Sequence, residues 1–124
     1  MITEDYISFE TAKLLKEKGF NESCIYVYRH DGSEDIWDAD KEDIAYQKPT
    51  LQTVMKWLRE VHHYYIQVML DSWACGGHLG YYVVIQKTDS DFEMMLQDAV
   101  DEVFYQTYEE ACEAAIKYCL ENLI

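Results

Sequence analysis

Apolar residues recur along this chain at two periods, one typical of helices and the other of strands. Over residues 8–19 and 50–62 the apolar positions follow the three- and four-residue spacing of amphipathic helices. Ser8 and Thr50 are suitable N-cap residues, and Gly19 is suited to ending the first helix. We therefore predict a helix in each segment. The apolar stripe predicted for the second helix consists of Leu51, Val54, Met55, Leu58, Val61 and His62, with Trp57 at its edge.

An alternation of period two begins near residue 65. Residues 65–73 read as a half-buried strand, and a second extended run covers residues 81–86. The glycine-rich segment from Cys75 to Gly80 lies between the two runs and predicts a turn, so we expect a long antiparallel hairpin. A strand is also predicted over residues 24–29, with a return strand starting at residues 36–37.

The end of the chain combines one ambiguous segment with one clear helix. Residues 92–104 have helical spacing, yet residues 103–106 could complete the sheet as a strand, so we predict a short helix followed by an extended segment. Thr107 and Glu110 form a capping box before a continuous apolar stripe, which predicts a final helix. Residues 1–124 should form a single α+β domain with two layers. In it, three helices pack mainly on one face of an antiparallel sheet of about four or five strands.

Charge narrows the class of partner. Apolar residues make up 49% of the 124 residues, which excludes whole-chain disorder, and the net charge is −14. Such a surface repels phosphate backbones and anionic lipids, so we expect neither nucleic-acid nor membrane binding but a protein partner with a basic surface. The alternative is that the charge serves only solubility. No apolar run reaches a membrane-spanning length, and the acidic start lacks signal-peptide character, so we expect a cytoplasmic protein.

The four cysteines show no paired spacing typical of a metal site or a disulfide framework. Cys112 and Cys119 lie seven residues apart on the predicted final helix, which separates them by roughly 10 Å, too far for a disulfide. We expect buried free thiols and a reducing compartment.

Four residues suggest a metal or ligand site: His62, His63, Cys75 and His78. Cys75 and His78 could approach each other across the glycine turn, whereas the adjacent His62 and His63 cannot share one face of a helix. The other interpretation is a polar helix end beside an ordinary loop, because the spacing lacks the tight ligand pairs of zinc sites. No nucleophile motif is present, so the sequence indicates no catalytic residue and no cofactor.

Aromatic and acidic side chains favour binding over catalysis. The chain contains eleven tyrosines and three tryptophans, residue types that are enriched in interface hot spots. Seven acids lie between Asp31 and Asp43. The candidate interaction residues are Trp57, Arg59, Tyr65, Trp73, Tyr82, Asp35, Asp38 and Asp40.

Two segments carry a resemblance to known sequences. The run from Pro49 to His62, PTLQTVMKWLREVH, and the closing helix that begins TYEEA at Thr107 resemble short uncharacterised proteins. Phages, prophages and mobile elements of gut Bacteroides-type bacteria encode those proteins, which have no established activity. The resemblance implies a small accessory protein in a bacterial cytoplasm and supplies no catalytic residues.

Three hypotheses follow. The first is a non-enzymatic protein that binds another protein through its acidic or aromatic surface and self-associates through the sheet edge or the second helix. The second is a small enzyme or a metal- or ligand-binding domain that uses the four histidine and cysteine candidates. The third is a structural component of a phage particle.

Overall fold

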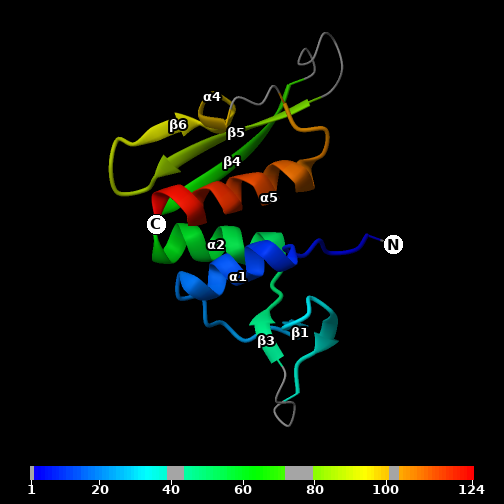
Figure 1. Cartoon of the computed structure of the whole chain (residues 1–124). Coiled ribbons are helices and arrows are strands. Elements are labelled where there is room, and N and C mark those ends of the chain that lie inside the picture. Colours follow the sequence, from blue (N-terminus) through cyan, green and yellow to red (C-terminus); the bar gives the residue numbers. More distant parts are fainter. Residues whose placement is uncertain (1, 39–43, 72–79, 101–103) are drawn as a thin grey trace.

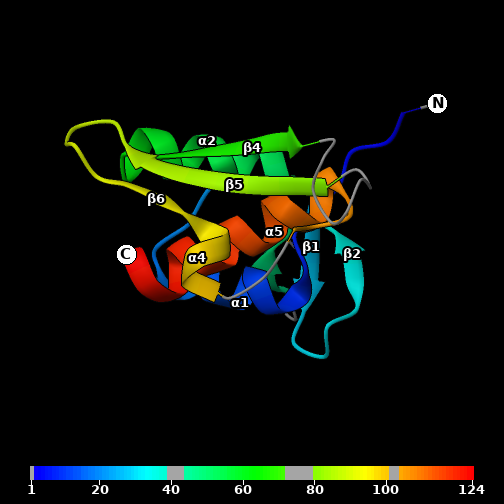
Figure 2. The ribbon, with the colours of Figure 1, turned by 90° about the horizontal axis from the view of Figure 1, so that it is seen from above.

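The computed structural model describes residues 2–38, 44–71, 80–100 and 104–124. Two three-stranded antiparallel sheets lie on opposite sides of a group of helices (Figures 1 and 2). In chain order the elements are α1 (Phe9–Glu17), β1 (Tyr26–Arg29), β2 (Glu34–Ile36), β3 (Ile44–Gln47), α2 (Leu51–Val61), β4 (Tyr64–Asp71), β5 (Gly80–Lys87), β6 (Glu93–Met95), α4 (Leu96–Val100) and α5 (Tyr108–Tyr118), which continues into the π-helical turn η1 (Cys119–Leu123).

The predicted ends of the helices are confirmed by their caps. Ser8, Thr50 and Thr107 each accept a hydrogen bond from the backbone N–H three residues on. After α1, Gly19 has a φ of 91°, and the N–H of Phe20 donates to the carbonyl of Leu15 at 3.0 Å. This is a Schellman motif, in which glycine takes the left-handed position at no steric cost.

The first sheet is a local meander in the order β2-β1-β3. Tyr28 of β1 pairs with Glu34 of β2 on one side and with Tyr46 of β3 on the other. Phe9 of α1 meets the rings of Tyr28 and Tyr46 edge to face at 5.5 and 5.6 Å, so this sheet is attached to the helices through α1.

The second sheet has the order β4-β5-β6 and contains the predicted hairpin. The β4–β5 ladder runs without a break from the Tyr64–Lys87 pair to the Asp71–Gly80 pair, and its connecting loop lies outside the described residues. Helices α2 and α5 pack on one face of this sheet (Figure 1).

The core lies where these helices meet the second sheet. Its fully buried side chains include Leu58 of α2, Ile85 of β5 and Ile116 of α5. Cys112 and Cys119 are buried and free, as expected. The predicted α2 stripe is wrong at Val61, which is 55% exposed because the helix ends there and the chain turns away, whereas Trp57 is buried.

The α+β class is confirmed, but the prediction of one two-layer sheet with three helices is wrong in detail. Within the described residues, the strands before α2 pair only with one another, because short connections favour pairing between strands that are neighbours in the sequence. In the ambiguous segment, β6 precedes the short helix α4, and Tyr105 then forms an isolated bridge to Tyr81. The predicted helix followed by an extended segment is therefore partly confirmed.

Candidate functional site

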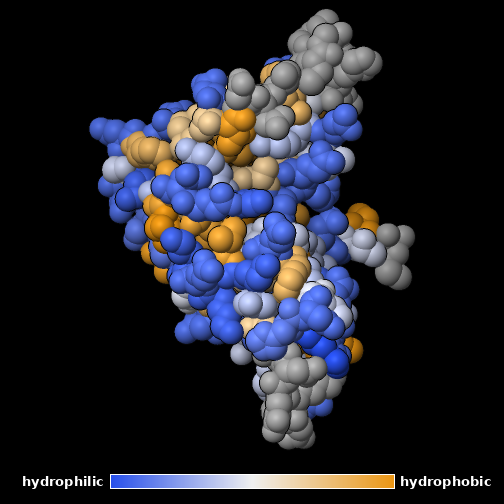
Figure 3. Space-filling model, in the orientation of Figure 1, coloured by the Kyte–Doolittle hydropathy of each residue, from blue (hydrophilic) through white to orange (hydrophobic). Residues whose placement is uncertain are grey.

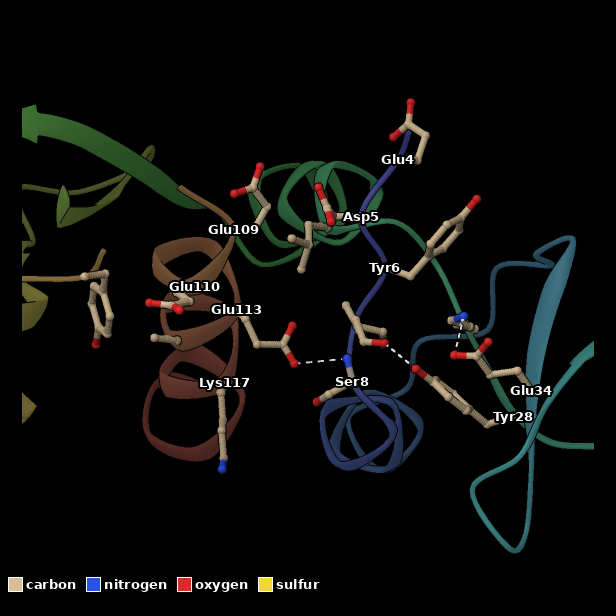
Figure 4. Close-up of a pocket in the computed structure, with 15 residues that line it drawn as sticks. Glu4, Asp5, Tyr6, Ser8, Tyr28, Glu34, Glu109, Glu110, Glu113 and Lys117 are labelled. Carbon is tan, nitrogen blue, oxygen red and sulfur yellow. Dashed lines mark hydrogen bonds and ion pairs between the residues drawn. The ribbon is translucent and has the colours of Figure 1, made fainter. Parts of the chain in front are cut away.

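A groove of about 780 Å³ lies between the N-terminal segment, residues 4–8, and helix α5, with the first sheet at its end (Figure 4). We call it the acidic groove, because six carboxylates line it. They are Glu4 and Asp5 of the N-terminal segment, Glu34 of β2, and Glu109, Glu110 and Glu113 of α5. Two lysines, Lys48 and Lys117, also line it.

The N-terminal segment is fixed in place by backbone and side-chain hydrogen bonds. The N–H of Ile7 donates to the carbonyl of Pro49 at 3.1 Å, and the N–H of Leu51 donates to that of Asp5 at 2.9 Å. The Tyr28 hydroxyl donates to the carbonyl of Ile7 at 2.6 Å. One wall of the groove is therefore held without belonging to a regular strand.

Glu113 joins the two walls. Its Oε1 accepts a hydrogen bond from the backbone N–H of Ser8 at 3.0 Å (Figure 4). The same oxygen accepts a second hydrogen bond from the Thr11 hydroxyl at 2.8 Å. Because Ser8 caps α1, this carboxylate also lies at the positive end of that helix. The other oxygen, Oε2, is buried and has no hydrogen-bond partner among the described residues.

The two lysines are already paired with acids of this chain. Lys48 Nζ lies 2.8 Å from Glu34, and Lys117 Nζ lies 3.9 Å from Glu121. Lys48 also lies over the rings of Tyr6, Tyr28 and Tyr26, at 4.9, 5.4 and 5.9 Å from the ring centroids. Its side chain is only 11% exposed, so this cation–π cluster belongs to the wall of the groove.

Four carboxylates of the groove face solvent without a cation of their own. Glu4, Asp5, Glu109 and Glu110 are exposed, and none forms an ion pair within the part of the chain that the structure describes. The local negative charge also affects Tyr28. Burial, followed by the charges of Glu34 and Glu113, raises the pKa of this tyrosine to about 12.

The structure describes two of the four predicted metal or ligand residues, and these two lie in different surroundings. His62 is half-buried and packs edge to face on Trp57 at 4.6 Å, and its Nε2 has no hydrogen-bond partner among the described residues. Burial, and then the charge of His63, lowers the pKa of His62. His63 is exposed at the turn into β4. Cys75 and His78 lie outside the described residues, and no metal-binding group of three ligands occurs within residues 2–38, 44–71, 80–100 and 104–124.

The predicted interaction residues are distributed over several surfaces. Tyr65, 41% exposed, and Tyr82, half-buried, lie on the face of the second sheet opposite the helices. Trp57 is 8% exposed and belongs to the core, where it meets Phe20 edge to face, and Arg59 is half-buried on α2.

The two described acidic residues of the predicted set, Asp35 and Asp38, do not line the groove. Asp35 pairs with Arg29, and Asp38 is exposed. Asp40 and Trp73 lie outside the described residues. The surface in Figure 3 is mostly hydrophilic on the face shown, with hydrophobic side chains visible mainly over the helices.

The residues that build the groove were not identified from the sequence. Glu4 and Asp5 are separated from Glu109 and Glu110 by about a hundred residues, so no spacing links them. The available signal was the four-residue interval between Glu109 and Glu113, which places two acids on one face of a helix.

No family model, curated protein or solved structure matches this chain. No helix within the described residues is long and apolar enough to cross a membrane.

Proposed function

We propose that this protein is a non-enzymatic accessory protein that binds a lysine- or arginine-rich segment of another protein in the acidic groove. The observation that supports this most directly is the set of four exposed carboxylates on the two walls of the groove, which have no described ion-pair partner. A basic segment placed between the walls would supply the missing cations to both.

The expected affinity follows from the exposure of these groups. An exposed ion pair contributes roughly 0.2–1 kcal/mol, so four such contacts give modest and strongly salt-dependent binding. The net charge of −14 adds long-range attraction, which speeds the encounter with a basic partner more than it tightens the complex. The function is therefore best suited to reversible regulation of a basic protein.

The resemblance to short proteins of mobile elements fits this proposal. An accessory protein of that setting would act in the cytoplasm of the host bacterium, where basic proteins that bind nucleic acids are abundant targets. The acidic groove would then compete for the basic surface of such a target and would not bind nucleic acid directly.

Binding to the groove can be measured with a fluorescein-labelled nonalysine peptide, whose anisotropy rises when it binds. Reversing two charges on one wall, in the variant Glu109→Lys/Glu110→Lys, should weaken binding several-fold at low salt. The matched control is Asp89→Lys/Asp91→Lys, which changes the net charge equally in the exposed turn between β5 and β6.

An equal loss of affinity in both variants would show that the peptide responds to net charge alone, and the groove would lose its role. Partners can be identified by affinity capture of the tagged protein from host lysate, followed by mass spectrometry. A true partner should be retained at low salt, released at high salt and absent with the Glu109→Lys/Glu110→Lys variant.

A further inference from the structure

Strand β4 forms an open edge of the second sheet, and we propose that two copies of this protein join there into a dimer with a continuous six-stranded sheet. This inference concerns β4 and is independent of the acidic groove. It rests on the direction of the backbone groups of β4, on the side chains along β4, and on the length and charge of the other edge strands.

The hydrogen bonds of β5 show which groups of β4 are open. The N–H groups of Tyr81, Val83 and Lys87 all bond away from β4, to the Tyr105 carbonyl, the Gln97 side chain and the Phe92 carbonyl. In an antiparallel pair, residues that bond away from each other alternate with residues that bond to each other. Their partners in β4, which are Leu70, Val68 and Tyr64, therefore direct their N–H and C=O groups to the free side, and so does Ile66.

No described residue bonds to these backbone groups of β4. The far side of β5, in contrast, is covered along its length by β6, by the Gln97 amide and by the Tyr105 bridge. The fold therefore places hydrogen-bonding partners along one side of the hairpin and leaves the other side open.

The first seven side chains of β4, before Asp71 at its end, offer none of the features that normally prevent edge pairing. Residues 64–70 contain no charge, no proline and no bulge, although the chain carries a net charge of −14. The other described edge strands, β2, β3 and β6, are only three or four residues long, and acids occur on β2 and β6. Among the described strands at a sheet edge, β4 alone contains a run of seven uncharged residues.

A two-fold axis at Gln67 matches this edge to itself. Ile66 then forms a hydrogen-bonded pair with the partner's Val68, and Tyr64 forms one with the partner's Leu70. Each copy supplies four N–H and four C=O groups, so the ladder has eight hydrogen bonds and no open group remains between residues 64 and 70. Leu70, which is 56% exposed in one chain, becomes paired with an aromatic residue.

The outer face is matched in the same way. Tyr65 lies opposite the partner's Met69, residues that are 41% and 40% exposed in the single chain, and Gln67 lies opposite the partner's Gln67. Each residue of this edge therefore lies opposite a partner residue of similar polarity, which favours a second copy of the chain over an unrelated strand. Because each chain has one such edge among its described strands, the assembly closes at two copies.

The pairing also places the two α2 helices on the same face of the joined sheet. Packed helices need 8–10 Å between their axes, whereas neighbouring strands are 4.7–4.9 Å apart. We therefore expect the joined sheet to coil so that the helices diverge from the junction.

Sedimentation equilibrium of the whole chain tests the proposal directly. The wild-type protein should change with concentration from a species of 14.7 kDa to one of twice that mass. In the variant Val68→Pro the proline removes a backbone N–H that points to the open edge and not to β5, so the hairpin should persist while the dimer is lost. A wild-type protein that stays at 14.7 kDa at all concentrations, or a folded Val68→Pro variant that still dimerises, would overturn the proposal.

Cross-linking tests the register separately and does not depend on the proline variant. Gln67→Cys, in a background with Cys24 and Cys75 changed to serine, should form an intermolecular disulfide under mild oxidation. The two Cα atoms of a non-hydrogen-bonded pair lie about 4.5 Å apart, within disulfide range. Met95→Cys is the control, because Met95 is 40% exposed on the same sheet face but belongs to β6. Equal cross-linking of the two variants would refute the β4 register.

Discussion

Replacing Glu113 by alanine should destabilise the protein far more than replacing any other acid of the groove. The Thr11 hydroxyl that donates to Glu113 belongs to a residue that is 1% exposed, so the substitution removes its charged acceptor and leaves only the neutral Ser8 hydroxyl, 3.1 Å away, as a described partner. A hydrogen bond to a charged group contributes about 1.5–3 kcal/mol, and the exposed Ser8 N–H adds little because water replaces the lost acceptor. We expect a total loss of about 2–3 kcal/mol in the free energy of unfolding.

Urea denaturation followed by far-ultraviolet circular dichroism measures this loss. With an m-value of about 1–3 kcal/mol/M, a change of this size lowers the midpoint by roughly 0.7–3 M. Glu109→Ala is the matched control, since it removes the same charge from an exposed position on the same helix and should cost no more than about 1 kcal/mol. Glu113→Gln, which retains an acceptor without the charge, should fall between the two.

A double-mutant cycle with Thr11→Val identifies the bond responsible. If the Thr11–Glu113 hydrogen bond accounts for the loss, the two substitutions should be non-additive by about 1 kcal/mol or more. Additivity within about 0.5 kcal/mol, or equal costs for Glu113→Ala and Glu109→Ala, would refute this account of how the two walls are joined.

Three further outcomes are expected. The pKa of His62 is lowered in the folded state, so its contribution to the free energy of unfolding is complete above pH 6.5 and is lost as the pH falls from 6.5 through the folded pKa. Urea titrations at several pH values should show this pH dependence in the wild-type protein and its loss in His62→Phe. Gly32 has a φ of 87°, and a Cβ there would lie 3.2 Å from the Phe9 ring, so Gly32→Ala should cost about 1–3 kcal/mol, measured as a lower thermal midpoint. Burial raises the pKa of Cys112 to about 11 and that of Cys119 to about 12, so peptide mapping after iodoacetamide treatment should find both unlabelled in the native protein and labelled in urea, and native labelling of either would contradict their burial.

Local signals predicted much of the fold. The three caps at Ser8, Thr50 and Thr107 and the period-two alternation of the hairpin depend on residues a few positions apart, and each was found in the structure. Strand β3 was missed, because a four-residue run next to an acidic stretch has no strand pattern of its own. It is a strand because β1 supplies its partner.

The candidate site could not be predicted in the same way. Its central contact joins Ser8 to Glu113 across 105 positions in the sequence, and the capping box near Glu113 indicates a helix start without showing what that helix faces. Trp57 was predicted to be an interaction residue but is buried in the core. Aromatic residues suit cores and interfaces equally, and tertiary packing alone placed this one inside.

The position of Lys48 among Tyr6, Tyr26 and Tyr28 has a spectroscopic consequence. Aromatic ring currents shield protons that lie over the ring faces, so the ε-methylene protons of this lysine should resonate upfield of those of the exposed Lys56 in a proton NMR spectrum. Because Tyr6 belongs to the N-terminal segment and the other two rings belong to β1, that resonance reports whether the segment is attached to the first sheet. A titration with a basic peptide that leaves it unchanged would show that the groove binds with its wall in place.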